Sequence, residues 1–122
     1  MRDLASQITA SFEEVAAIER RKNNPSGYIH ERMMQIIAEQ EQLLSAEQEL
    51  GVAVVGGNAP SFHLRSIGYS NPDLLRFVGT DPDGNTVQIV QHHTQMSIMI
   101  VSVPKLGEKA FRVGFVPSNH EN

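Results

Sequence analysis

The sequence predicts one α+β domain, in which N-terminal helices precede an antiparallel sheet of four to five strands with a helix packed on it. Near Gly51 the spacing of apolar residues changes from a helical to a strand period. Downstream, residues 81–85 (DPDGN) separate two short apolar segments and have the composition of a hairpin turn. A chain of 122 residues suits one domain with one modest core. We expect residues 1–27 to form a helical arm and linker, and residues 28–122 to form the α+β domain.

The first predicted element is an amphipathic helix near the N-terminus. Its apolar residues recur at helical spacing: Leu4, Ile8, Phe12, Val15 and Ile18. Basic residues 20–22 follow in the last turn, where positive charge suits the helix dipole. The apolar face must be covered by the chain's own core or by a second copy, and we expect a homo-oligomer.

A second predicted helix runs from about residue 28 to residue 49. Ser26 is the candidate N-cap residue, and Gly51 follows the end of the helix. Five glutamates accompany one arginine between residues 28 and 50, mostly outside the apolar stripe. We therefore expect an acidic, solvated face on this helix.

Beyond Gly51 the pattern predicts strands. Phe62 and Leu64 alternate with polar neighbours, as in a strand with one buried face. The other expected strands are residues 51–56, 74–80, 86–92 and 111–115. Residues 94–103 are ambiguous, because their β-branched residues favour a strand while their apolar residues also fall at helical spacing.

Composition excludes several classes of function. A net charge of −4 argues against general nucleic-acid binding, which needs a basic face. The absence of cysteine excludes disulfides and thiolate chemistry. There is no apolar run long enough to span a membrane and no secretion signal, so we expect a cytoplasmic protein that does not bind membranes.

Catalytic and metal-binding motifs are also missing. His92 and His93 are adjacent, and neighbouring strand residues point to opposite faces, so they cannot easily share a metal ion. No serine lies in a nucleophile elbow, and three of the four carboxylates at residues 73, 81, 83 and 108 belong to turns. We therefore expect neither an enzyme nor a bound metal or cofactor.

The remaining polar residues suggest a binding site for a nucleotide-like ligand. Arginine forks match phosphate oxygens, flat side chains stack on a base, and amides pair with its edge. In the strand-rich half, Arg65, Arg76 and Arg112 fall on three separate predicted strands. The candidate ligand-binding residues on this half are Arg65, Phe77, His92, His93, Gln95 and Arg112. A phenylalanine in this context is more often a core residue than a ligand contact, and this is the alternative for Phe77.

The strand-rich half also carries strings typical of a known family. They are IGYSNP, GTDPDGN, QHHTQ, VPK and RVGF, within residues 67–115. From Tyr28 on, the chain resembles the short phage and bacterial domain of unknown function numbered 6173. This resemblance favours a helix over residues 94–103.

In element order and length the chain is also similar to the Thoeris anti-defence proteins, phage sponges that sequester cyclic ADP-ribose immune signals. That resemblance implies a small oligomeric protomer that holds its nucleotide without cleaving it. Its order of arginines adds Arg32, on the second predicted helix, to the candidate ligand-binding residues. The resulting hypothesis is a phage-derived sponge for a cyclic nucleotide or cyclic ADP-ribose-type signal in the cytoplasm of a bacterial host. The alternative is an anti-CRISPR-like or other inhibitor that occludes a protein partner.

Overall fold

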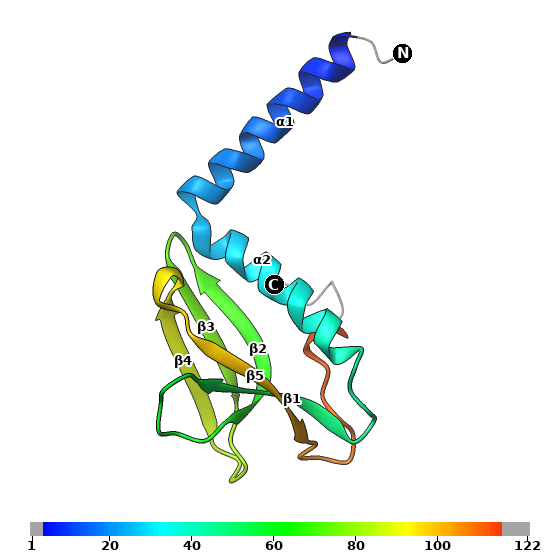
Figure 1. Ribbon diagram of the computed structural model, residues 1–122, viewed down its shortest axis with the longest axis vertical. Coiled ribbons are helices and arrows are strands. Elements are labelled where there is room, and N and C mark those ends of the chain that lie inside the picture. Colours follow the sequence, from blue (N-terminus) through cyan, green and yellow to red (C-terminus); the bar gives the residue numbers. More distant parts are fainter. Residues whose placement is uncertain (1–3, 116–122) are drawn as a thin grey trace.

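The computed structural model describes the backbone of residues 4–115 and the side chains of residue 12, residues 14–19 and residues 21–114. Helices α1 (Leu4–Asn23) and α2 (Pro25–Glu41) precede all the strands. The strands are β1 (Gln48–Val54), β2 (Phe62–Ser70), β3 (Leu74–Thr80), β4 (Thr86–His92) and β5 (Ile98–Pro104). Two short 3₁₀ turns, η1 (His93–Gln95) and η2 (Val113–Phe115), complete the described chain. The predicted α+β fold is confirmed (Figure 1).

The five strands form one curled antiparallel sheet in the order β4-β3-β2-β1-β5. Long ladders join β2 to β3 and β3 to β4. The last strand, β5, returns to pair with β1 over seven residues. Between β1 and β2 only two residue pairs are formed, so the two parts of the sheet run at an angle to each other (Figure 1).

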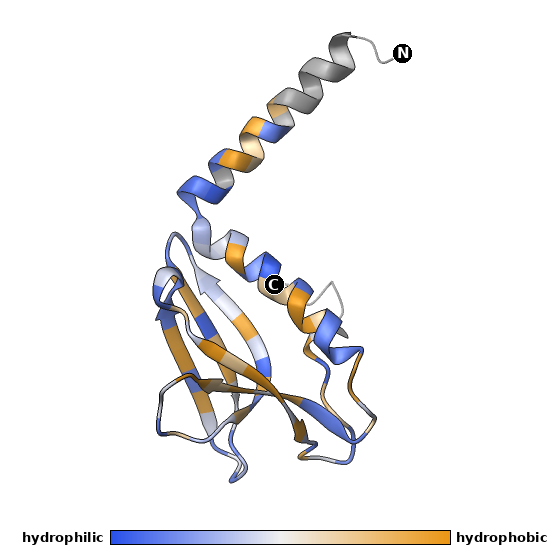
Figure 2. Ribbon diagram, in the orientation of Figure 1, coloured by the Kyte–Doolittle hydropathy of each residue, from blue (hydrophilic) through white to orange (hydrophobic). Residues whose placement is uncertain are grey.

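The core lies between α2 and the sheet. Met33 and Ile37 come from one face of α2, and Leu64, Leu75 and Phe77 are among the strand residues that meet them. Val113 of η2 closes the core near the end of α2. Apolar residues accordingly line the strands and one side of α2 in Figure 2.

The helix α1 extends away from the sheet (Figure 1). Among its described side chains, Phe12, Val15 and Ile18 are 70%, 52% and 51% exposed. The other two residues of the predicted apolar stripe, Leu4 and Ile8, lie outside the described side chains.

Three predicted boundaries were wrong. Ser26 lies inside α2, which begins at Pro25 after Asn24, and its hydroxyl bonds to Ser70 and Asn71 rather than capping the helix. The helix ends at Glu41 instead of residue 49, because residues from 48 onward pair with β5. Residues 111–115 form no strand, since the Glu41 carboxylate accepts the Val113 and Gly114 N–H groups that a neighbouring strand would otherwise take.

The helix favoured for residues 94–103 was also wrong. A 3₁₀ turn occupies residues 93–95, and β5 follows from Ile98 to Pro104. The strand is selected by its partner, because β1 offers a complete seven-residue ladder of hydrogen bonds that an isolated helix could not match. The hairpin at residues 81–85 is confirmed, with the Asp81 carboxylate accepting the Asp83 and Asn85 N–H groups at 2.9 Å.

Candidate functional site

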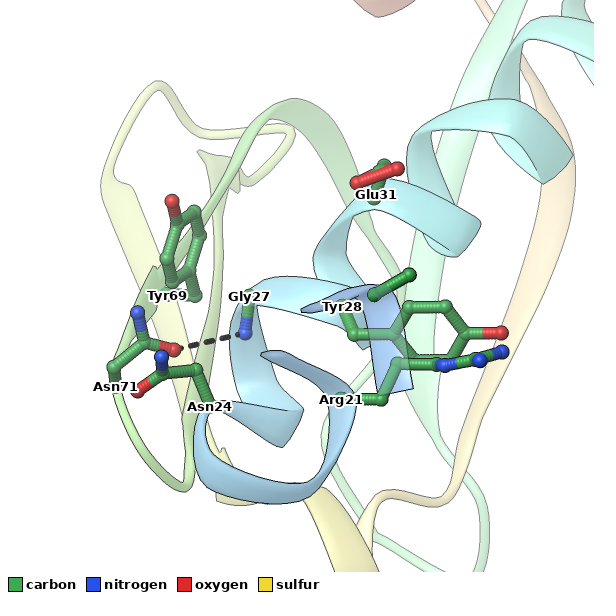
Figure 3. Close-up of a pocket in the computed structure, with 8 residues that line it drawn as sticks. Arg21, Asn24, Gly27, Tyr28, Glu31, Tyr69 and Asn71 are labelled. Atoms are coloured by element: carbon green, nitrogen blue, oxygen red, sulfur yellow. Dashed lines mark hydrogen bonds between the residues drawn. The ribbon is translucent and has the colours of Figure 1, made fainter. Parts of the chain in front are cut away.

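The candidate site lies where α1, α2 and the β2–β3 turn meet. The first turn of α2 is fixed to the β2–β3 turn by hydrogen bonds. The Ser26 hydroxyl donates to the Ser70 carbonyl at 3.0 Å, and the Ser26 N–H donates to the Pro72 carbonyl at 2.9 Å. The Asn71 side-chain oxygen accepts the Gly27 N–H at 3.0 Å (Figure 3). These bonds fix the position of the first turn of α2 relative to the β2–β3 turn.

Gly27 allows this close approach. A Cβ atom at residue 27 would lie 3.1 Å from the Asn71 side-chain oxygen and 3.3 Å from the Tyr69 ring. Both distances are tighter than ordinary van der Waals contact. The absence of a side chain at residue 27 therefore lets Tyr69 and Asn71 stand directly against the helix.

Next to these hydrogen bonds lies a pocket of about 400 Å³, which we call the junction pocket. Its volume falls in the range of small-molecule sites. The pocket is lined by Ala17, Arg21, Asn24, Gly27, Tyr28, Glu31, Tyr69 and Asn71. In Figure 3 Tyr69 and Asn71 stand on one side of Gly27, and Tyr28 and Arg21 stand on the other.

Positive charge gathers around Tyr28. The guanidinium of Arg21 lies over its ring, 5.4 Å from the ring centre. Arg32 Nη1 donates to the Tyr28 hydroxyl at 3.3 Å. The hydrogen bond from Arg32, reinforced by Arg21, lowers the pKa of Tyr28 below its usual value. The two guanidiniums therefore favour negative charge at the Tyr28 hydroxyl, while Glu31 adds one carboxylate to the same pocket.

The orientation of the Tyr69 ring is fixed by its contact with His30. The His30 ring packs against the Tyr69 ring with their centres 4.8 Å apart. His30 is itself fixed, because its Nε2–H donates to the Ile67 carbonyl at 2.9 Å. The Tyr69 ring is 42% exposed, so an aromatic surface is presented to solvent at a defined angle.

Three of the predicted ligand-binding residues have partners inside the protein. Arg112 donates to the carbonyls of Ser45, Gln48 and Phe111 at 2.9, 2.7 and 3.1 Å. Arg65 pairs with Glu49 at 3.1 Å and lies over the Phe111 ring. Phe77 is fully buried in the core. In this arrangement Phe77 has no face open to a ligand, and the two guanidiniums serve the packing of residues 111–114.

The other four lie elsewhere. His92 and His93 stack on each other with ring centres 4.8 Å apart, and Gln95 is exposed in the same turn. His93 N–H donates to the Asp73 carbonyl, which places this turn beside the β2–β3 turn. Arg32 contacts Tyr28 on α2. The seven residues thus fall into separate groups, and among the described side chains no hydrogen bond or ion pair joins one group to another.

A buried charged cluster surrounds Glu49, which is 1% exposed. Its carboxylate accepts the Phe111 N–H at 2.9 Å and contacts His63 Nδ1 at 2.6 Å and Arg65 Nη2 at 3.1 Å. Burial alone would raise the pKa of Glu49, but the Phe111 N–H, His63 and Arg65 outweigh it and lower that pKa. The negative charge is therefore stable at neutral pH and fastens the chain around Phe111 to the sheet.

The sequence-based prediction did not include Glu41, Tyr28 or Tyr69, although the sequence contained a signal for Glu41. Glu41 follows Met33 and Ile37 at helical spacing, so a charge in phase with the apolar stripe marked a buried carboxylate. The two tyrosines of the pocket are the only ones in the chain. Nothing local indicated that Tyr28 and Tyr69, 41 positions apart, line one cavity. Within the described residues, no group of three His, Cys, Asp or Glu side chains could hold a metal ion.

The fold defines a small α+β protein with two N-terminal helices and a curled five-stranded antiparallel sheet. The chain belongs to a family of unknown function, DUF6173, whose profile matches residues 20–116. Neither the curated proteins nor the solved structures give a match. The matched range contains α2, the whole sheet and the junction pocket except Ala17. No helix in the described part of the chain is long and apolar enough to cross a membrane.

Proposed function

We propose that the protein is a non-catalytic binding protein that sequesters a small nucleotide-type anion, of the cyclic nucleotide or cyclic ADP-ribose class, in the junction pocket. The observation that carries this proposal is the lining of the pocket, which combines two tyrosines, an arginine, a glutamate and two asparagines around about 400 Å³. We also propose that this sequestration serves a phage-derived anti-defence role in the cytoplasm of a bacterial host, the role that a resemblance to the Thoeris sponges implies.

Each part of such a ligand has a matching group. The Arg21 guanidinium supplies a charge-assisted partner for a phosphate. The exposed Tyr69 ring supplies a stacking surface for a base. Asn24 and Asn71 carry amides that can pair with a base edge, and the Glu31 carboxylate can accept from ribose hydroxyls.

The proposed site lies away from the strand residues first predicted to bind the ligand. Arg65, Arg112 and Phe77 are engaged within the fold, so binding a ligand there would break existing contacts. Arg32 keeps an indirect part, because it adds positive charge beside Tyr28. His92, His93 and Gln95 flank the neighbouring turn and remain available to a larger ligand.

The test is calorimetry with cyclic ADP-ribose and 3′,5′-cyclic AMP, after a thermal-shift screen of the same compounds. Losing one charged hydrogen bond to phosphate should weaken binding about 10- to 100-fold in Arg21→Ala. Lys22→Ala is the matched control, because Lys22 is an exposed cation on the same turn but outside the pocket lining. Equal affinity of both variants and the parent would place the ligand elsewhere, and no binding of any compound would remove the nucleotide proposal.

We further propose that a second copy covers the apolar face of α1 in a homo-oligomer. Phe12, Val15 and Ile18 lie on one helical face and are all more than half exposed. Light scattering on Phe12→Ser/Ile18→Ser should give a lower mass than the parent, whereas Ala16→Ser on the same helix should not. An unchanged mass would show that α1 is not the contact.

A second candidate function is inhibition of a protein partner by surface occlusion. It is favoured by apolar side chains exposed on both helices, including Ile36 and Leu43 at or just beyond α2. The acidic face predicted for residues 28–49 has fewer exposed charges than expected, because Glu41 and Glu49 are buried and hydrogen-bonded within the protein. A sponge should release an ultraviolet-absorbing small molecule on heating, whereas an occluding inhibitor should release none.

A further inference from the structure

The strand β4 forms one edge of the sheet and lacks the charges, prolines and bulges that usually protect an edge. It is seven residues long, pairs with β3 in continuous register, and contains no proline and no Lys, Arg, Asp or Glu. Natural edge strands are normally blunted by such charges, by prolines or by bulges, because an open row of backbone groups can recruit another strand. The opposite edge strand, β5, ends in Pro104. We therefore expect the open edge of β4 to pair with another strand.

The hydrogen bonds at both ends of the β3–β4 ladder show which backbone groups are open. Asp81 N–H donates to Asn85, and His93 N–H donates to Asp73. These two pairs continue the β3–β4 register, in which hydrogen-bonded and non-hydrogen-bonded pairs alternate. The odd-numbered residues of β4 consequently bond to β3. Thr86, Gln88, Val90 and His92 direct their backbone N–H and C=O groups outward, and within residues 4–115 no other strand pairs with this edge.

The open edge is complementary to itself. When β4 is placed antiparallel to a copy of itself with Ile89 on the two-fold axis, Gln88 lies opposite Val90 and Thr86 lies opposite His92. All four are outward-directed residues, so each pair can exchange two hydrogen bonds, about eight in all. No Lys, Arg, Asp or Glu is brought opposite a like charge. Such a two-fold contact closes on itself rather than growing into a fibre.

The side chains at this edge also suit a partner. Val90 is 50% exposed, and Leu74 on the adjacent strand is exposed on the same face of the sheet. Their register partners across the ladder are Arg76 and His92, which leaves an apolar surface with polar neighbours. A second sheet continuing from β4 would cover Val90 while leaving the polar groups in water.

We infer that β4 pairs antiparallel with β4 of a second copy, so that the sheets of two protomers become one continuous sheet. This contact is independent of the nucleotide pocket and of the α1 surface. The two contacts together would link protomers into an assembly larger than a dimer.

The first test is the mass of Val90→Lys by light scattering. Two lysines at the shared edge should abolish the β4 contact. Ser66→Lys is the matched control, because it places the same charge on the same face of the sheet but on the interior strand β2. In the α1-blocked variant Phe12→Ser/Ile18→Ser, an unchanged β4 edge should give a mass twice that of the 13.5 kDa protomer. Adding Val90→Lys should reduce the mass to that of one protomer. Adding Ser66→Lys should leave it at twice the protomer mass. A protomer mass with the parent edge, or a dimer in Val90→Lys, would overturn the inference.

Amide hydrogen exchange on the α1-blocked protein provides the second test and does not depend on the folding of a β4 variant. The Thr86, Gln88 and Val90 amides should exchange slowly at high protein concentration and faster on dilution. Edge amides that exchange fast at every concentration, while Ile89 stays protected by β3, would refute the β4 contact.

Discussion

Replacing Glu49 by glutamine isolates the contribution of the buried carboxylate with little change in shape. The variant keeps an acceptor for Phe111 N–H but loses the charge that faces His63 and Arg65. Breaking a fully buried ion pair costs about 3–5 kcal/mol. Arg65 is 26% exposed and can be rehydrated in part, so we expect a smaller loss, about 2–3 kcal/mol of unfolding free energy. That is a large share of the stability of a small domain.

The assay is urea denaturation followed by circular dichroism, at about pH 7 and again at about pH 3. The folded pKa of Glu49 is lowered, so its stabilisation is present above the unfolded value near 4.5 and is lost as pH falls through the folded pKa. The gap between parent and Glu49→Gln should therefore shrink in acid. Glu47→Gln is the control, because its pair with Lys105 is exposed and contributes at most about 1 kcal/mol. The reasoning fails if Glu49→Gln loses no more stability than Glu47→Gln, or if its deficit does not change with pH.

Three further outcomes follow from the packing. Arg112→Ala should lower the unfolding free energy by about 2–3 kcal/mol, measured by urea titration. Arg112→Lys should be nearly as destabilising, because a lysine cannot donate to three separate carbonyls, and a lysine variant as stable as the parent would contradict this. Gly79→Ala should strongly lower the melting temperature, because its Cβ would collide with the β2 backbone and an aromatic ring. Gly107→Ala is the control, because a Cβ there meets no atom nearby. Equal melting temperatures of the two variants would contradict the prediction. Arg32→Ala should raise the pKa of Tyr28 toward 10.0 in an ultraviolet titration with the other tyrosine replaced by Phe, and an unchanged curve would count against the hydrogen bond.

Local chemistry was enough to predict much of the fold. The Asp81 turn works through a carboxylate that binds backbone groups two and four residues ahead, so its signal lies within one short segment. Residues 98–104 satisfy both periodicities, and the strand is decided by β1, about fifty residues earlier in the chain. Sequence patterns carry no information about such a distant partner.

The candidate site was less predictable for the same reason. The sequence shows that Arg65 and Arg112 are scarce cations on the strand-rich half, but not that a buried carboxylate and three carbonyls engage them. Backbone carbonyls are present at every residue, so a guanidinium directed at them leaves no signature. The pocket depends on the meeting of α1, α2 and the β2–β3 turn, which arises only from tertiary packing.

The attachment of residues 111–114 to Glu41 and Glu49 has a consequence for synthesis on the ribosome. While those residues are still inside the exit tunnel, both carboxylates lack the N–H donors that bind them in the folded protein. Arg112 is also absent, so the connection between α2 and β1 has no cross-brace. Burying the Glu41 charge without these donors is unfavourable, and the burial of Glu49 is then compensated by His63 and Arg65 alone. The nascent chain should therefore keep α2 and β1 open, and the domain should close only after this segment emerges.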